Sequence, residues 1–484
     1  MRIRLFVGLL ALAGCTLGPD YKRPDTALPQ QYPEASTGTA AGVVPNWWTL
    51  YSDATLNELI ASGQKNNSDL RLAVARVQEA EGALREVRAS IFPEITGSAS
   101  YARQGVSTLS QPPVPPGIAT VRPNYQALIS TSYEVDFWGR LSRTTEAARA
   151  NLFANQLSRD TVDITLAGAI AQAYFALRSL DAQIAVLDIS IRTRRDSLEI
   201  ARARLDAGLT PELDVYQAQS ALSDAVVQRR DTARGRALVE HQLAQLTGRF
   251  DLKLPAEKLA GDVFGLPLVP LPPAGLPSAL LDRRPDIRQA EEGLVAANAQ
   301  IGIARAAMFP TISLTASAGV QSAQFADLVA GPGASIWSLG MALAGPLIDE
   351  GRREARVDQA RARREQALAG YQKAVETGFR EVSDALVNVQ QSGESEAELK
   401  ARLDAARNAL ELSTLRYQSG YSPYLEVLDA QRTANDAELA FVRNRQSRLA
   451  FSVDLMKALG GGWTDNYTQA QKSVSDTDSS KARP

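Results

Sequence analysis

Few residues of this chain have the types and spacing that catalysis or metal binding needs. His241 is the only histidine, and it falls in a stretch with a helical pattern, where a packed or surface role is the simpler interpretation. The sequence contains no phosphate-binding loop, no metal-ligand cluster and no nucleophile spaced with a base. Carboxylates are spread along the predicted helices, as is normal on solvated helix faces. The sequence therefore gives no support for an enzyme, a metal site or a bound cofactor.

Cys15 is the one residue for which the sequence indicates covalent chemistry. It is the only cysteine, which excludes a disulfide framework. Arg2 and Arg4, followed by an apolar stretch too short to span a membrane, predict a signal peptide over residues 1–14. The Leu-Ala-Gly before the cysteine resembles a bacterial lipobox, whose cysteine is acylated and becomes the mature N-terminus. Thr16 favours the outer membrane, because an Asp at this position tends to indicate retention in the inner membrane; a chance cysteine is the alternative.

The chain contains a long internal repeat. Pro93 and Pro310 each end a predicted helix and lie 217 residues apart, and the Gly208 turn returns 212 residues later at Gly420. A repeat of this length is a duplicated half-protein rather than a solenoid unit of about 20–50 residues. We therefore expect one molecule made of two similar halves.

Each half is predicted to contain two β-strands, because apolar and polar residues alternate in four segments. These segments lie at about 94–106, 124–136, 311–321 and 335–345. Their length matches a tilted membrane-spanning strand, and the Ser, Thr and Gly of the polar side suit a water-filled lumen. A soluble β-sandwich on a helical stalk is the alternative. Four strands cannot close a barrel, so several chains must pool their strands; three chains would give 12 strands and two would give 8, and the alternation does not choose between them.

Two proline-free runs of about 70 residues predict very long helices. They begin at Arg140 and Arg352 and end at Gly208 and Gly420. At 1.5 Å per residue each would measure about 100 Å, roughly three times the thickness of a membrane core. The shorter helices predicted before and after the first run together match its length, so they could stack end to end beside it.

Charge and hydropathy narrow the class of protein further. The chain has 52 Lys and Arg against 54 Asp and Glu, a net charge of −2, so no basic surface for nucleic acid is indicated. It has no run of 18 apolar residues, and we expect no transmembrane helix. The remaining boundaries follow from composition and from the repeat: an extended N-terminal arm at 15–52, the first repeat at 53–248, a linker at 249–280, the second repeat at 281–462 and a partly disordered tail at 463–484.

Several motifs together resemble one bacterial family. Residues 12–24 read Leu-Ala-Gly-Cys-Thr-Leu-Gly-Pro-Asp-Tyr-Lys-Arg-Pro, and similar matches occur at 281–287, 304–310, 424–432 and 457–463. Over nearly the whole mature chain, the sequence resembles the NodT-type outer-membrane factor lipoproteins. The resemblance implies an α+β membrane protein, a trimeric 12-strand β-barrel with four strands per chain that continues into a long periplasmic α-helical barrel. It also implies two partners, a periplasmic adaptor and an inner-membrane transporter, often of the RND class.

The resemblance assigns a role to the two turns that end the long helices. It implies adaptor contact at Gly208, Leu209, Thr210, Gly420, Tyr421 and Ser422. From the residues alone, Gly208 and Gly420 can adopt the left-handed helix C-cap, while Thr210 and Ser422 can cap the helices that follow. Two tight helical hairpins without a partner are the simpler interpretation.

The resemblance also implies a gate in the helix that follows the Gly420 turn. Leu425 and Asp429 are four residues apart and share a helical face. The family's matching positions imply that three copies of Leu425 plug a closed trimer and that three copies of Asp429 ring its axis. Carboxylates about 6 Å apart would repel by roughly 1–3 kcal/mol per pair, and Arg432 is the nearest counter-charge. An exposed ion pair worth about 0.2–0.5 kcal/mol is the alternative.

The sequence thus predicts a lipid-anchored outer-membrane channel, the passive exit duct of a tripartite efflux system. A type I secretion or metal-efflux duct is the nearest alternative, and a structural periplasmic coiled-coil lipoprotein is an alternative of another class. Paired lipid-facing strands favour a channel, because a scaffold has no use for them. The lumen-facing residues are generic, so we expect the transporter to select the substrate.

Overall fold

The computed structural model describes residues 16–26, 29, 32, 46–107, 115, 117, 119–256, 280–330 and 333–461. These residues form two compact units, each built from several chain segments. The first unit holds residues 16–25, 76–155 and 289–371; the second holds the described residues of 26–75, 156–288 and 372–461. The predicted signal peptide, Cys15, most of the predicted linker and the predicted tail lie outside the described residues.

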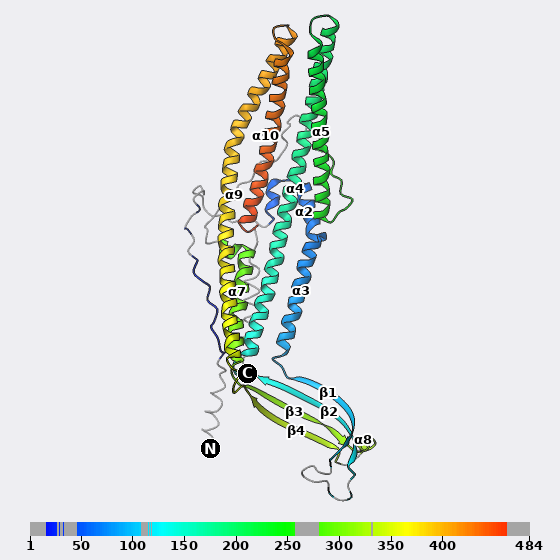
Figure 1. The fold of residues 1–484 in the computed structure, drawn as a ribbon, viewed down its shortest axis with the longest axis vertical. Helices are drawn as coiled ribbons and strands as arrows, with labels where there is room; N and C mark the ends of the chain where they lie inside the picture. The colour runs from blue at the N-terminus through cyan, green and yellow to red at the C-terminus, as the bar shows by residue number, and fades with distance from the viewer. Residues whose placement is uncertain are drawn as a thin grey trace. The chain divides into compact units, whose positions relative to one another are not determined.

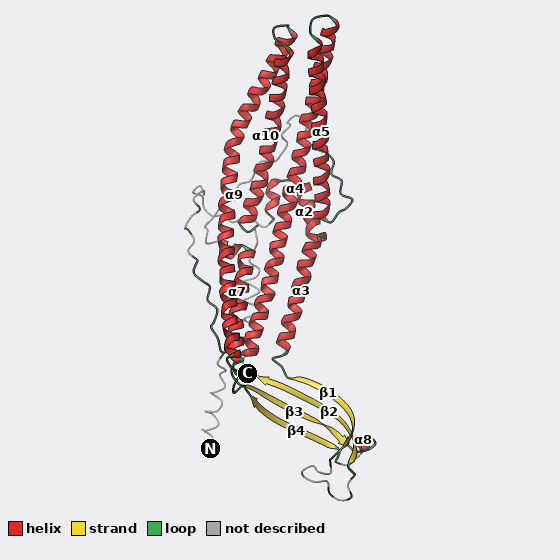
Figure 2. Cartoon of the chain, in the orientation of Figure 1, coloured by secondary structure: helices red, strands yellow, loops and turns green. Residues whose placement is uncertain are grey.

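A four-stranded antiparallel sheet dominates the first unit (Figures 1 and 2). Its strands are β1 (Glu94–Gly105), β2 (Val121–Val135), β3 (Thr311–Ser322) and β4 (Ser335–Ala344), paired in chain order. The pairing of β2 with β3 joins the hairpin of one half to the hairpin of the other. A short helix, α8 (Asp327–Ala330), lies in the connection between β3 and β4. The repeat therefore forms one continuous sheet.

The two faces of the sheet differ in polarity, as the alternation predicts. Hydroxyl pairs link neighbouring strands on the polar face, where Ser317 and Ser338 lie 2.8 Å apart. The alternate positions of β4 carry large apolar side chains that are 71–80% exposed, namely Trp337, Leu339, Met341 and Leu343. An apolar row of this size that the chain itself leaves uncovered indicates contact with lipid or with another protein.

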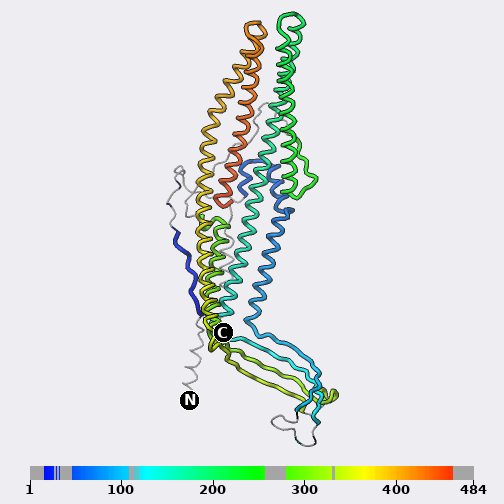
Figure 3. The backbone as a smooth tube through the Cα atoms, viewed as in Figure 1, coloured from blue at the N-terminus to red at the C-terminus, as the bar shows by residue number. Residues whose placement is uncertain are grey.

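The long helices are α4 (Arg140–Asp206) and α9 (Arg352–Gln418), each of 67 residues. Each turns back into a shorter helix, α5 (Glu212–Thr247) or α10 (Tyr424–Ala458), and the two hairpins are plain in the backbone trace of Figure 3. No helix in the described ranges is long and apolar enough to cross a membrane.

The core of the second unit forms where the start of the first repeat packs on α4 and α10. A 3-10 helix, η1 (Trp47–Tyr51), lies just before the first repeat, and the repeat begins with α2 (Ala54–Asn66). Trp47 is fully buried, and Tyr51 packs on Phe175 with ring centroids 4.9 Å apart. Burial of such side chains, at about 1.5–3 kcal/mol each, explains why this end of the predicted extended arm is helical.

Short helices meet end to end at two junctions of the second unit, in equivalent positions of the two repeats. Between α2 and α3 (Ser68–Ala89), the Asn67 side-chain amide donates to the Leu246 carbonyl near the end of α5 at 3.0 Å. Between α6 (Leu280–Arg283) and α7 (Pro285–Ala306), the Arg284 guanidinium donates to the Ala458 carbonyl at the end of α10 at 3.1 Å. One side chain therefore satisfies a helix-end carbonyl at each junction, as a buried helix end requires. The end-to-end stacking predicted for the shorter helices around the first long run is confirmed at the first of these junctions.

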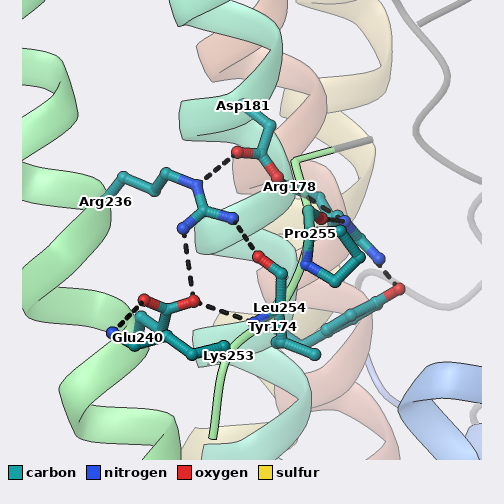
Figure 4. Close-up of polar contacts among 8 residues, drawn as sticks. All are labelled: Tyr174, Arg178, Asp181, Arg236, Glu240, Lys253, Leu254 and Pro255. Atoms are coloured by element: carbon teal, nitrogen blue, oxygen red, sulfur yellow. Dashed lines mark hydrogen bonds and ion pairs between the residues drawn. The ribbon is translucent and has the colours of Figure 1, made fainter. Parts of the chain in front are cut away.

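A polar network holds the chain just after α5 (Figure 4). The Arg236 guanidinium donates to Asp181 at 2.6 Å and to the Leu254 carbonyl at 2.7 Å. The Leu254 amide donates to Glu240 at 2.9 Å, and the Arg178 guanidinium reaches the Pro255 carbonyl at 3.2 Å. The first described residues of the predicted linker are thus held against α4 and α5.

Candidate functional site: the turns that end the long helices

The two turns share one backbone geometry. Gly208 and Gly420 have φ angles of 72° and 81°, in the left-handed region. The amide of Leu209 donates to the Arg204 carbonyl, and the amide of Tyr421 donates to the Arg416 carbonyl, both at 2.8 Å. These bonds close the ends of α4 and α9 in the way that a left-handed glycine cap allows. The predicted C-caps are confirmed.

The predicted N-caps are wrong. Pro211 and Pro423, not Thr210 and Ser422, occupy the cap positions of α5 and α10, and both prolines are extended, with ψ near 156–158°. A cap side chain must reach the second or third amide of its helix, and residues one position earlier lie too far back. The hydroxyls of Thr210 and Ser422 are instead buried without a hydrogen-bond partner in the described structure.

The turns expose apolar side chains. Leu209 is 68% exposed and Tyr421 is 79% exposed. These two side chains at the ends of the hairpins are suitable contacts for a partner protein, because their burial would gain the hydrophobic free energy that the single chain leaves unused.

The predicted gate residues lie together on the exposed face of α10. Leu425 is 60% exposed, whereas Tyr424 and Val427 face the core. The Arg432 guanidinium donates to the Asp429 carboxylate at 2.8 Å, and both side chains are more than 60% exposed. The expected counter-charge is therefore in place within one chain, and the acid–base pair is accessible to a partner.

One link between the two hairpins was not predicted from the sequence. The Arg204 guanidinium, near the end of α4, donates to the Tyr417 carbonyl near the end of α9 at 2.9 Å and lies 4.8 Å from the centre of the Tyr417 ring. The Tyr417 ring packs on Tyr424 with centroids 5.4 Å apart. Burial raises the pKa of Tyr424 to about 12, so its hydroxyl stays neutral at physiological pH. The repeat gave a weak indication that Arg204 has a structural role, because Arg416 occupies the equivalent position of α9.

Comparison with known proteins places the chain in a family. The family model described as outer membrane efflux protein matches residues 59–249 and again 276–461, once in each repeat. The chain is 32% identical over 481 residues to the toluene efflux pump outer membrane protein TtgC of Pseudomonas putida, with 98% of each chain covered. It is 33% identical to the cation efflux system protein CusC of Escherichia coli, with 95% of this chain and 98% of that one covered.

A solved structure gives the same result. The crystal structure of the open state of the Neisseria gonorrhoeae MtrE outer membrane channel superposes with a TM-score of 0.83 at 29% identity, covering 93% of this chain and 98% of that one. The chain belongs to the outer membrane efflux protein family.

Family membership confirms the predicted fold class, function and location. The protein is an outer-membrane channel of an efflux system, and its chain combines four membrane strands with long helices that extend into the periplasm. The match favours a channel over the structural coiled-coil lipoprotein. The roles of the tip and gate residues stay predictions.

Proposed function

We propose that three copies of this chain form the exit duct of a tripartite efflux system and conduct substrate passively, without chemistry of their own. The support comes from the edges of the sheet. Because β1 and β4 are the outer strands in each chain, both leave unpaired backbone groups, which cost several kcal/mol each in hydrocarbon. Pooling the strands of several chains into one closed barrel removes every edge, and the family resemblance implies three chains and 12 strands.

Two partners complete the system in this proposal. A periplasmic adaptor docks on the exposed Leu209 and Tyr421 and on the turn residues beside them, and it joins the duct to an inner-membrane transporter. Relatives named for toluene efflux and for cation efflux match this chain almost equally well. We therefore assign the choice of cargo to the transporter.

The lipid anchor belongs to the same proposal. Cys15 carries the acyl chains, and the residues after it support this role: the Leu17 amide donates to the Trp138 carbonyl at 3.1 Å, next to the end of β2. Acyl chains attached two residues before Leu17 would enter the membrane beside the strands.

The gate lies at the Leu425 and Asp429 face of α10. In the closed trimer, three Leu425 side chains fill the axis and three Asp429–Arg432 pairs surround it. The observation that carries this proposal is the exposed ion pair at 2.8 Å, because it lets the carboxylates approach one another without uncompensated repulsion.

The test is single-channel conductance in planar bilayers. Removing both charges with Asp429→Ala and Arg432→Ala should raise the mean conductance severalfold and increase leakage of large antibiotics into cells. The matched control is Lys400→Ala with Asp404→Ala, another exposed ion pair on the same hairpin. Equal conductance of the gate variant and the wild type would move the gate elsewhere, and no conductance from any folded, lipidated oligomer would refute the channel.

A further inference from the structure

A cavity with an excess of positive charge lies in the first unit. It measures about 450 Å³ and is formed by residues 19–22, α7 and the third and fourth turns of α9. Figure 3 shows the N-terminal segment (blue) running beside these helices. Four basic side chains line the cavity, Lys22, Arg305, Arg361 and Arg364, against two carboxylates. Its volume falls within the range of about 300–1,000 Å³ that is usual for ligand sites.

Two of the four basic side chains already have carboxylate partners, since Arg361 pairs with Asp358 at 2.9 Å and Arg364 pairs with Glu365. Asp20 pairs at 2.6 Å with Arg143, which does not line the cavity. Lys22 and Arg305 have no hydrogen bond or ion pair to any residue that the structure describes. Among the described residues, Lys22 and Arg305 therefore line the cavity without a carboxylate partner.

The cavity lies close to the membrane-facing end of its unit. Arg305 is in the last turn of α7, and β3 begins six residues later at Thr311. Between them, Phe309 stacks on Trp138 with ring centroids 4.6 Å apart. Aromatic side chains at strand ends are typical of the membrane–water interface, where lipid headgroups lie.

We propose that this cavity binds the phosphate of an anionic phospholipid from the periplasm-facing leaflet. The planar guanidinium of Arg305 can donate two parallel hydrogen bonds to phosphate oxygens, and the Lys22 ammonium adds a mobile point charge. A zwitterionic headgroup brings its own cation and cannot offset the excess. The site lies where the strands leave the membrane, so a membrane lipid reaches it more readily than a soluble phosphate does.

The predicted consequence is a second attachment to the membrane beside the anchor on Cys15. The lipid would contact the N-terminal segment and two helices together, since Lys22 comes from the segment, Arg305 from α7 and Arg361 from α9. It would thereby hold these elements in register just outside the strands. This inference rests on the outer-membrane location but not on the proposed gate.

The test is native mass spectrometry of the full-length, lipidated oligomer in detergent, with added phosphatidylglycerol or phosphatidylcholine. We expect selective binding of phosphatidylglycerol, weakened about tenfold or more by Lys22→Gln with Arg305→Gln. The matched control, Arg356→Gln with Arg363→Gln, removes the same charge from exposed positions of α9 that do not line the cavity, and should bind like the wild type.

Three outcomes would overturn the proposal: equal binding of both lipids, equal weakening by both double variants, or displacement of phosphatidylglycerol by an equal concentration of inorganic phosphate. The last result would assign the site to soluble phosphate. Unchanged conductance of all variants in planar bilayers would show that the channel itself is intact, so that failure of the lipid site is distinct from failure of the channel.

Discussion

At the scale of single residues, the polar network around Arg236 illustrates how a buried carboxylate is kept charged. Burial alone would raise the pKa of Glu240, but the Leu254 amide, the Lys253 ammonium and the Arg236 guanidinium together lower it below the ordinary value of 4.5. The folded state therefore binds a proton less readily than the unfolded state. The resulting stabilisation is complete above about pH 4.5 and is lost as the pH falls through the lower folded pKa.

The lowered pKa of Glu240 predicts how the stability of the Glu240→Gln variant depends on pH. At pH 7 the variant should be destabilised by about 1–3 kcal/mol, because it leaves the partly buried Arg236 with one fewer anionic partner. Thermal unfolding in detergent, followed by circular dichroism, should show that the difference in stability from the wild type narrows as the pH falls below about 4.5. Glu411→Gln, at an exposed position of α9, is the control and should stay within about 0.5 kcal/mol of the wild type. A gap that is constant with pH would contradict the assigned pKa direction.

At the scale of elements, the same amino acid has opposite roles at two positions of one helix. Gly420 ends α9 with a positive φ, and no atom lies within 4 Å of an added Cβ. Gly370 lies inside α9, also with open space around an added Cβ, and its φ is not positive. Steric clash is thus absent at both positions, and backbone conformation alone should decide the effect of alanine.

We therefore expect Gly420→Ala to lower the free energy of unfolding by about 1 kcal/mol, the cost of a left-handed alanine. Gly370→Ala should raise it by about 0.5–1 kcal/mol through helix propensity. Melting temperatures of the two variants should move in opposite directions. Destabilisation by both would indicate that another chain packs against Gly370 in the assembly.

At the scale of the whole molecule, the duplication produces two hairpins that are similar but not interchangeable. The two equivalent arginines make different contacts: Arg204 of the first hairpin donates to the Tyr417 carbonyl of the second, whereas Arg416 lies 3.6 Å from Glu426 within its own hairpin. A link between hairpins resists their separation, and in the proposed trimer we expect such separation to widen the channel end.

Arg204→Gln should therefore increase the open fraction of single channels severalfold. Arg202→Gln is the control, because Arg202 is exposed and its side chain donates to Gln219 within the first hairpin. If the two variants conduct alike, the hairpins are held together by the assembly rather than by this link. The measurement uses the same planar bilayers as the gate test, so the two effects can be compared directly.

Local patterns in the sequence by themselves determine the elements of this protein. Alternation with period two predicts the four strands, because successive side chains of a strand point to opposite faces. The absence of proline between Arg140 and Gly208 predicts one uninterrupted helix, since an interior proline removes a backbone bond. The family motifs then identify the channel. All of these signals are carried by residues that are close in sequence.

Only the tertiary structure decided which distant residues meet. Local spacing suggested Thr210 as a cap, but the extended proline after it displaced the helix start by one residue. The contact of Asn67 with the Leu246 carbonyl, the link from Arg204 to Tyr417 and the basic cavity around Arg305 join segments far apart in the chain. Such contacts depend on how whole helices pack and on where each one ends. No short-range pattern carries that information, so the elements were predictable and their shared sites were not.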